Sequence, residues 1–204
     1  MKTKIFALFI LLALALSACS AEAAPVMYIQ PAELTEEEEA IAKLLGADTD
    51  QHLFDVVLDG TARKISICTY ELADGKWERF SGGGGLRLEE NMTTGRLCFG
   101  FEDMRKEFRQ AVQFGGKDYF AVSWEAPEEE EEDPEGMSRT TAFFSNRTEI
   151  VYEKEIPLAI QINTTKNEVS SYDPEYFFRP EEYEKLGYEH VYALTVTFSQ
   201  EPLS

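Results

Sequence analysis

Residues 53–60 have the sequence LFDVVLDG, in which the apolar positions 54, 56 and 58 alternate with Leu53, Asp55 and Val57 before an Asp-Gly pair. A period of two is typical of a β-strand with one buried face, and Asp-Gly favours a tight hairpin turn. Phe54, Val56 and Leu58 are therefore expected to face a core. The segment predicts a strand that begins near His52 and ends at the turn.

The same alternation recurs along the chain. Four further segments carry inward-facing sets: Leu97, Phe99 and Phe101; Phe120, Val122 and Trp124; Leu158, Ile160 and Ile162; Leu194, Val196 and Phe198. Six or more half-buried strands need a second layer to cover their apolar faces. The chain is therefore predicted to be an all-β protein, an antiparallel β-sandwich of the immunoglobulin-like or jelly-roll-like kind. A closed β-barrel is the alternative.

Glycine-containing turns separate the predicted strands, at Asp59-Gly60, Asp74-Gly75, residues 82–85 and Gly115-Gly116. Residues 103–114 fit both a helical and a strand spacing. Because apolar runs flank the sequence GGKD on both sides, we expect a hairpin there, with residues 108–114 as its first strand.

A short helix is expected at the N-terminal edge of the domain. Thr35 and Glu38 have the spacing of a capping box, and Gly46 supplies a stop signal. The apolar stripe of this helix consists of Ile41, Leu44 and Leu45. We expect this stripe to pack against the edge of the domain.

The first nineteen residues have the order of an export signal. Lys2 and Lys4 precede the apolar run 5–16, which is too short to cross a bilayer as a helix. The sequence Leu16-Ser17-Ala18-Cys19 resembles the lipobox of bacterial lipoproteins. This resemblance implies that Cys19 is acylated and becomes the first mature residue, so the protein is expected to be extracytoplasmic and anchored to a membrane by lipid.

The composition along the chain predicts a simple domain organisation. Residues 1–18 are the signal peptide, 19–34 a flexible tether rich in Ala and Pro, and 35–204 a single domain. Within this domain, residues 126–137 form an acidic loop and residues 171–188 a loop rich in aromatic residues. Pro180 to Leu186 suit a short helix that ends at Gly187.

The protein is a strong anion. Removal of residues 1–18 takes away two lysines and no acid, and the formal charge changes from −19 to −21. Binding of nucleic acid depends on cationic neutralisation of phosphates, so that class of partner is excluded. Anionic lipid headgroups would also be repelled, which leaves the lipid on Cys19 as the membrane attachment.

The histidines and cysteines are too few and too dispersed to predict a metal site or a cofactor. Cys68 and Cys98 lie in separate predicted strands, where two buried thiols are favoured slightly over a disulfide. His52 and His190 are the only histidines, and neither belongs to a nucleophile motif. No catalytic residue, cofactor or metal ligand is predicted, and we do not expect an enzyme.

The body of the chain also resembles small uncharacterised lipoproteins of Gram-positive bacteria. The resemblance is carried by Glu155-Ile156-Pro157-Leu158-Ala159-Ile160-Gln161-Ile162. It implies no activity.

Aromatic residues are the remaining candidates for ligand contact. Flat rings on all-β modules stack on sugars, and the candidates are Tyr70, Trp77, Tyr172, Tyr176 and Phe177. The alternative is that these rings form a lid that folds back over the sandwich, which the burial of large aromatic residues favours.

The sequence therefore predicts a lipid-anchored, non-enzymatic recognition or interaction module at the cell surface, with the aromatic loop 171–188 as its contact region. A carbohydrate-binding module is the alternative. A glycan hydrolase is a third hypothesis, but it requires two opposed carboxylates, and 38 acidic residues do not single out a pair.

Overall fold

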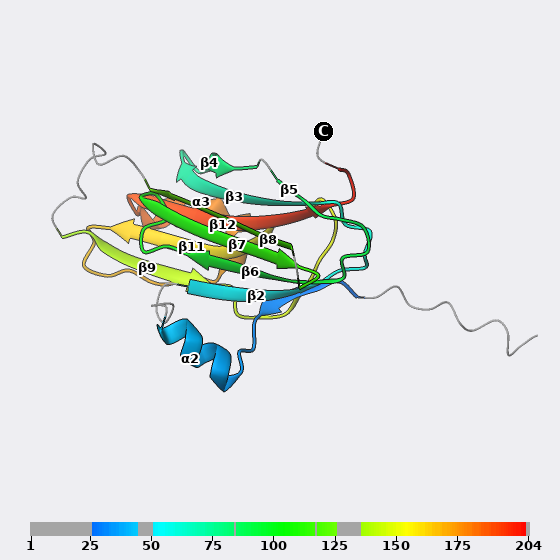
Figure 1. Cartoon of the computed structure of the whole chain (residues 1–204). Helices are drawn as coiled ribbons and strands as arrows, with labels where there is room; N and C mark the ends of the chain where they lie inside the picture. Colours follow the sequence, from blue (N-terminus) through cyan, green and yellow to red (C-terminus); the bar gives the residue numbers. More distant parts are fainter. Residues whose placement is uncertain (1–25, 45–50, 84, 117, 126–135, 203–204) are drawn as a thin grey trace, which may run out of the picture.

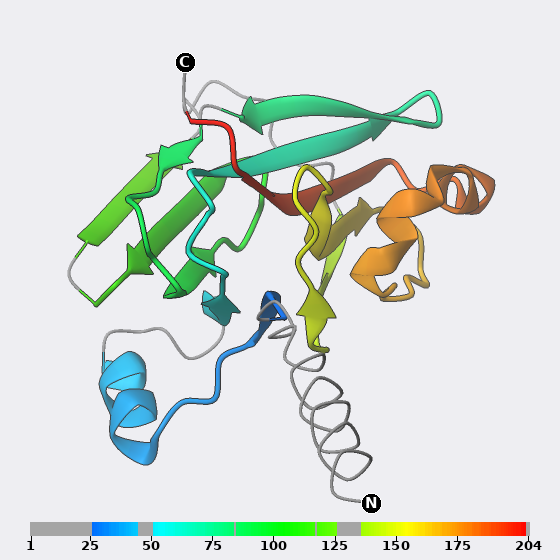
Figure 2. The ribbon, with the colours of Figure 1, turned by 90° about the vertical axis from the view of Figure 1, so that its right-hand side faces the viewer.

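The computed structural model describes residues 26–44, 51–83, 85–116, 118–125 and 136–202. Two antiparallel sheets pack face to face, as Figures 1 and 2 show. The predicted all-β sandwich is confirmed. The closed barrel is wrong, because the strands form two separate sheets. The leader 1–18 and Cys19 lie outside the described residues, as do residues 126–135 of the acidic loop.

Sheet A has six strands, in the order β10 (Thr148–Glu149), β1 (Tyr28–Pro31), β2 (Gln51–Val57), β6 (Thr94–Gly100), β7 (Glu107–Phe114) and β8 (Asp118–Glu125). Sheet B has the order β4 (Lys76–Gly82), β3 (Lys64–Ala73), β12 (His190–Ser199), β11 (Ile156–Thr164) and β9 (Ser138–Phe143), with β5 (Leu86–Arg87) paired to β3. Strands adjacent in sequence therefore often lie in different sheets.

The main core lies between the sheets and contains the expected inward residues of β2, β6 and β12. Phe54, Phe99 and Val196 are among its fully buried members. The expected hairpin at Asp74-Gly75 joins β3 to β4, and both residues have positive φ, as a type I′ turn requires. The hairpin expected at Asp59-Gly60 is wrong, because β2 and β3 belong to different sheets. The hairpin expected at residues 82–85 is also wrong, because β4 and β5 both pair with β3. Residues 107–114 form a strand, which confirms the hairpin around Gly115-Gly116.

The tether prediction 19–34 is wrong over its last part. Residues 28–31 form β1, which pairs with β2 and β10, and Ile29 is fully buried in the core. The alternation at Tyr28 to Pro31 covers only four residues, and such a short pattern does not distinguish a strand from an extended linker.

Helix α2 (Glu36–Leu44) has the expected capping box. The Thr35 backbone N–H donates to Glu38 Oε2 at 2.8 Å, and the Glu38 N–H donates to Thr35 Oγ1 at 3.3 Å. The expected packing is wrong, because α2 has no buried residue and Ile41 and Leu44 are exposed. Both views show the helix at the margin of the sandwich (Figures 1 and 2), where Glu38 accepts a hydrogen bond from Arg96 of β6 at 3.0 Å. Leu45 and Gly46 lie outside the described residues.

Strand β11 differs from its predicted pattern because its pairing with β12 contains a register shift between Pro157 and Ala159. The shift turns Leu158 into the main core, whereas Ile160 and Ile162 face the other side of sheet B. Every residue of β11 is buried, so this strand is covered on both faces.

The second cover of sheet B is formed by residues 171–188, hereafter the lid. It contains the 3₁₀-helix η1 (Pro174–Phe178) and helix α3 (Pro180–Leu186), which ends at Gly187 as expected. Figure 2 shows the lid in orange, on the far side of sheet B from the green strands of sheet A. Beneath it lies a second core with Ile160, Ile162, Val191 and Ala193.

Cys68 on β3 and Cys98 on β6 form no disulfide and belong to different sheets. Cys68 is buried, and Cys98 is half-buried. Within the described part of the chain, no helix has the length and apolar character needed to cross a bilayer.

Candidate interaction surface

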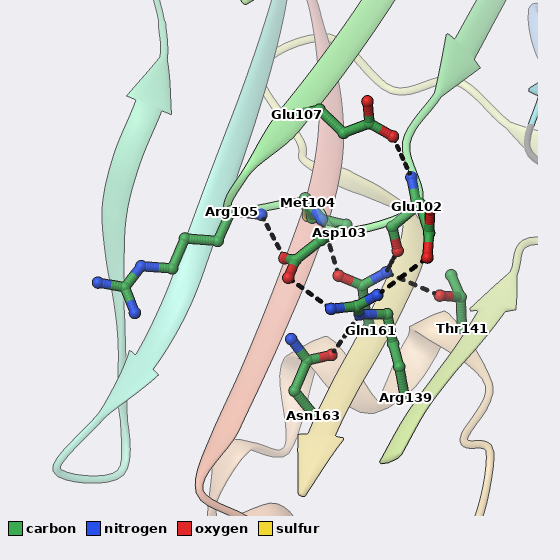
Figure 3. A network of polar contacts seen from close by, with 9 residues as sticks. All are labelled: Glu102, Asp103, Met104, Arg105, Glu107, Arg139, Thr141, Gln161 and Asn163. Carbon is green, nitrogen blue, oxygen red and sulfur yellow. Dashed lines mark hydrogen bonds and ion pairs between the residues drawn. The ribbon is translucent and has the colours of Figure 1, made fainter. Parts of the chain in front are cut away.

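The densest group of polar contacts lies at one end of the sandwich, where the loop between β6 and β7 meets sheet B (Figure 3). Asp103 of this loop accepts a hydrogen bond from Arg139 of β9, with 2.6 Å between Nη2 and Oδ2. Arg139 Nε also donates to Asn163 Oδ1 of β11 at 3.2 Å. The buried Asp103 carboxylate is thus paired with a cation.

Gln161 completes this polar group. Its Nε2 donates to the Glu102 carbonyl at 2.9 Å and to Thr141 Oγ1 at 3.0 Å, and its Oε1 accepts from the Met104 N–H at 2.8 Å. Gln161 and Met104 are fully buried. Since both ends of the buried amide are hydrogen-bonded, the cluster holds the loop 101–106 against sheet B and closes this end of the sandwich.

A second pair of polar side chains joins β12 to β3. His190 Nδ1 lies 3.1 Å from Glu71 Oε1, and its ring stacks on Tyr192 with an interplanar angle of 4°. Burial raises the pKa of the Tyr192 hydroxyl. The pair bridges neighbouring strands and lines none of the grooves described below.

Among the described residues, no group of three or more His, Cys, Asp or Glu side chains is arranged to hold a metal ion.

Two of the predicted contact residues, Trp77 of β4 and Phe177 of the lid, pack against each other. Trp77 Nε1 donates to the Phe177 carbonyl at 2.7 Å, and the two rings stack with centroids 5.1 Å apart. Phe177 is buried and Trp77 is half-buried. Tyr70 contacts the same Phe177 ring and donates from its hydroxyl to Glu155 Oε1 at 2.5 Å. Burial and then Glu155 raise the pKa of Tyr70.

Tyr172 and Tyr176, the other predicted contact residues, pack around Tyr183 of α3. The three ring centroids are 5.2 to 6.2 Å apart, and the planes are inclined by 58° to 76°. Tyr183 is buried, and its hydroxyl has no hydrogen-bond partner among the described residues. Rings so close and so inclined present no common flat face, so the geometry supports the lid rather than a sugar platform.

Half of the lid residues are exposed, and Phe178 is the aromatic residue among them. The Phe178 side chain is 61% exposed and lies beside a groove of about 180 Å³, which is also lined by Val151, Lys154 and Glu155. The buried residues of the lid are Pro174, Phe177 and Tyr183.

The largest departure from the predicted core is at strand β8. The alternation predicts that Phe120 and Val122 face inward, yet they are 41% and 39% exposed. The reason is that β8 is the last strand of sheet A and pairs only with β7 among the described strands. The side chain of Trp124 lies outside the described residues.

Phe120 borders two grooves between the sheets. One has a volume of about 310 Å³ and is lined by Leu86, Leu88, Met92, Val112, Phe114 and Phe120 among others. The other has a volume of about 170 Å³ and includes Ile65, Ile67 and Leu86 of sheet B. We name Phe120, Val122 and these two grooves the apolar edge. It is the side on which β8 and β5 leave the core partly uncovered.

A third groove, of about 280 Å³, lies on sheet A across β6, β7 and β8. Cys98, Ala111 and Ala121 are successive cross-strand partners that line it. Burial raises the pKa of the Cys98 thiol. Arg109, Val122 and Ser123 border the same groove.

No protein-family model, curated protein or solved structure matches the chain. Its function has to be inferred from its own residues.

Sequence reasoning missed both the polar cluster and the apolar edge. The alternation around Gln161 and Asn163 places them on a separate face from the apolar residues and names no partner. Their partners are far away in sequence, so no local pattern marks them: Glu102, Met104 and Thr141 for Gln161, and Arg139 for Asn163. Phe120 and Val122 carry the same period of two as a central strand, and that period does not reveal which strand ends a sheet.

Proposed function

We propose that this protein is a lipid-anchored extracytoplasmic interaction module without enzymatic activity, and that it binds a protein partner through the apolar edge. The leader and the sequence Leu16-Ser17-Ala18-Cys19 support the address and the anchor. The observation that carries the proposed binding role is the exposure of Phe120, which lines the two grooves, and of Val122 on the same strand.

An exposed edge strand with large apolar side chains is unfavourable for a protein that works alone. Its unpaired backbone groups and apolar surface promote association, and natural sheets usually protect such edges. The formal charge of −19 opposes self-association and keeps such a surface soluble. A specific partner then accounts for an edge that no described residue covers.

A photo-crosslinking amino acid at position 122, introduced into the full chain in its native cells, tests this role. We expect a discrete adduct of defined mass. Val151 is the matched control, because it has a similar exposure, 41% against 39%, on another surface. The adduct should be absent with the crosslinker at position 151 and should disappear when Phe120→Lys is added. Equal adducts from positions 122 and 151 would contradict the proposal.

The anchor has a separate test. Cys19→Ser should leave the precursor unprocessed and without acyl label, because the thiol that receives the lipid is missing. Normal processing of this variant would show that the leader is an ordinary secretory signal.

A further inference from the structure

We propose that β8 accepts an extended segment of the partner as an additional antiparallel strand, with apolar residues opposite Phe120 and Val122 and basic residues opposite Asp118 and Glu125. This inference rests on the proposed function and specifies its partner as a cationic, apolar β-strand. Four observations support it: the β8 backbone, the contrast with the other edges, the grooves and the charges.

The β8 backbone is a regular template. It pairs with β7 from Glu107↔Glu125 to Phe114↔Asp118 without any register shift. In an antiparallel ladder, every second residue of an edge strand directs its N–H and C=O away from its neighbour. The central residues Phe120-Ala121-Val122-Ser123 include no charge and no proline, the usual devices that protect an edge.

The other three edges of the sandwich are less suitable. Strand β10 has only two residues. Strand β4 contains Lys76, Glu78 and Arg79 and has an irregular register against β3. Strand β9 contains Arg139, which is engaged in the polar cluster. Strand β8 is therefore the longest regular edge with an uncharged centre in the described part of the molecule.

The grooves provide places for alternate side chains of an added strand. Such a strand would lie about 4.8 Å from β8, and every second side chain would point toward the gap between the sheets. Phe120 lines both grooves there, and Leu86 of sheet B forms their other wall. Main-chain hydrogen bonds would supply affinity and the grooves would select apolar residues, as in other cases of strand addition.

The charges favour a basic segment. Strand β8 begins with Asp118 and ends with Glu125, and Glu125 is in register with a second acid, Glu107. A basic residue on the added strand would complement the acidic residue types that the register places at these positions. The net charge of −19 also attracts a cationic segment over a longer range.

The same charges oppose a second copy of this chain as the occupant. In the antiparallel register that overlaps all eight residues of β8, Asp118 of one copy would lie opposite Glu125 of the other. Read from its N-terminus, the fitting segment has the pattern basic-x-x-apolar-x-apolar-x-basic.

The test uses the full chain in detergent and a fluorescent peptide of sequence KSTVTITK, which has this pattern. We expect saturable binding by fluorescence anisotropy. Val122→Lys should weaken it by about tenfold or more, because a lysine would oppose the apolar and cationic segment. Val151→Lys, on a surface of similar exposure, should change the affinity less than about twofold.

Two N-methylated peptides distinguish strand addition from groove binding. Each carries methyl groups on every second backbone nitrogen, in one or the other of the two possible sets. In strand addition only one set faces β8, so one peptide should lose binding and the other should keep it. Equal loss or equal retention would overturn strand addition, as would failure of KSTVTITK to bind.

The proposed function and this inference can fail separately. A specific crosslink at position 122 together with no peptide binding would retain the interaction role and reject the added strand. A dimer in sedimentation experiments that Val122→Lys dissociates would show that the occupant is a second copy, and it would overturn the inference.

Discussion

The outer face of sheet B and the β8 edge of sheet A both carry apolar residues, but only the first is covered. Ile160, Ile162 and Val191 lie under the lid, where Phe177 and Tyr183 are buried. Phe120 and Val122 have no comparable cover in the described part of the chain. Within the described residues, the chain therefore has a segment that covers one apolar surface and none that covers the other.

This difference separates two roles for aromatic and aliphatic residues in one sandwich. The lid residues contribute to folding, because their burial removes apolar area from water. We expect the partly exposed residues of the apolar edge to contribute less to folding. That the aromatic loop 171–188 is a contact region stays a prediction, although its buried rings Phe177 and Tyr183 pack on sheet B.

If the lid is a packed cover, its neighbouring phenylalanines Phe177 and Phe178 should contribute unequally to the free energy of unfolding. Phe177→Ala should lower the free energy of unfolding by about 3 kcal/mol. The reason is the cavity that it leaves under Trp77 and Tyr70. The Phe178 ring is 61% exposed. Phe178→Ala should therefore cost less than about 1 kcal/mol. Denaturant unfolding monitored by tryptophan fluorescence measures both, and equal losses would contradict a packed lid.

The closed end of the sandwich offers the next test. Arg139 is the cation that pairs with the buried Asp103 carboxylate. Arg139→Met should cost about 2 kcal/mol, because it leaves that carboxylate buried without this cation. Thermal unfolding measures the loss. An unchanged midpoint for Arg139→Met would show that the polar cluster does not hold this end closed.

The matched control for Arg139 is a lysine at the surface. Lys185 forms an exposed ion pair with Glu182 on α3. Lys185→Met should cost less than about 0.5 kcal/mol, because solvent screens such a pair. Equal losses from the two variants would mean that burial of the Asp103–Arg139 pair does not increase its contribution to the free energy of unfolding.

Gly187 ends helix α3 of the lid and leads the chain toward β12. Gly187 has φ +59°, a left-handed conformation that glycine adopts without strain. Gly187→Ala should cost about 1 kcal/mol, and Gly187→Asn should cost less, since asparagine tolerates this region better. Chemical denaturation of the two variants gives the comparison. A loss that is as large for asparagine as for alanine would point to a packing clash instead.

The sequence was sufficient to predict the features that depend on local backbone chemistry. The period of two and the glycine turns predicted most strands, the hairpin at Gly115-Gly116 and the end of the lid helix, because all of these depend on local backbone chemistry. The open edge, the buried Gln161 amide and the split of β11 at Pro157 were not predicted. They depend on strand order and on contacts between segments far apart in the sequence.

Glu189 follows the lid, and it should make the stability of the protein depend on pH. Hydrogen bonds from the side chains of Thr164 and Thr165 lower the pKa of Glu189 from 4.5 to about 2. Its ionised form therefore stabilises the folded state above about pH 4.5, and this contribution is lost as the pH falls toward 2. Between these values, the stability of Glu189→Gln should fall less steeply than that of the wild type. Parallel curves would contradict the assigned hydrogen bonds.

The smallest effect is expected on the open side. The Val122 side chain is 39% exposed, and Val122→Thr keeps its size and branching. The free energy of unfolding should therefore change by less than about 0.5 kcal/mol. The same variant should still weaken binding of the basic peptide. A large loss of stability would show that β8 is part of the closed core.

Residue-resolved amide hydrogen exchange of the full chain reports directly on whether the β8 edge is open to solvent. We expect every second amide of β8 to exchange fast, because it points away from β7, while the amides of β11 and β12 beneath the lid stay protected. Addition of KSTVTITK should slow the fast set in β8 alone. Uniform protection along β8 in the free protein would mean that this edge is already covered, and it would contradict an open interaction surface.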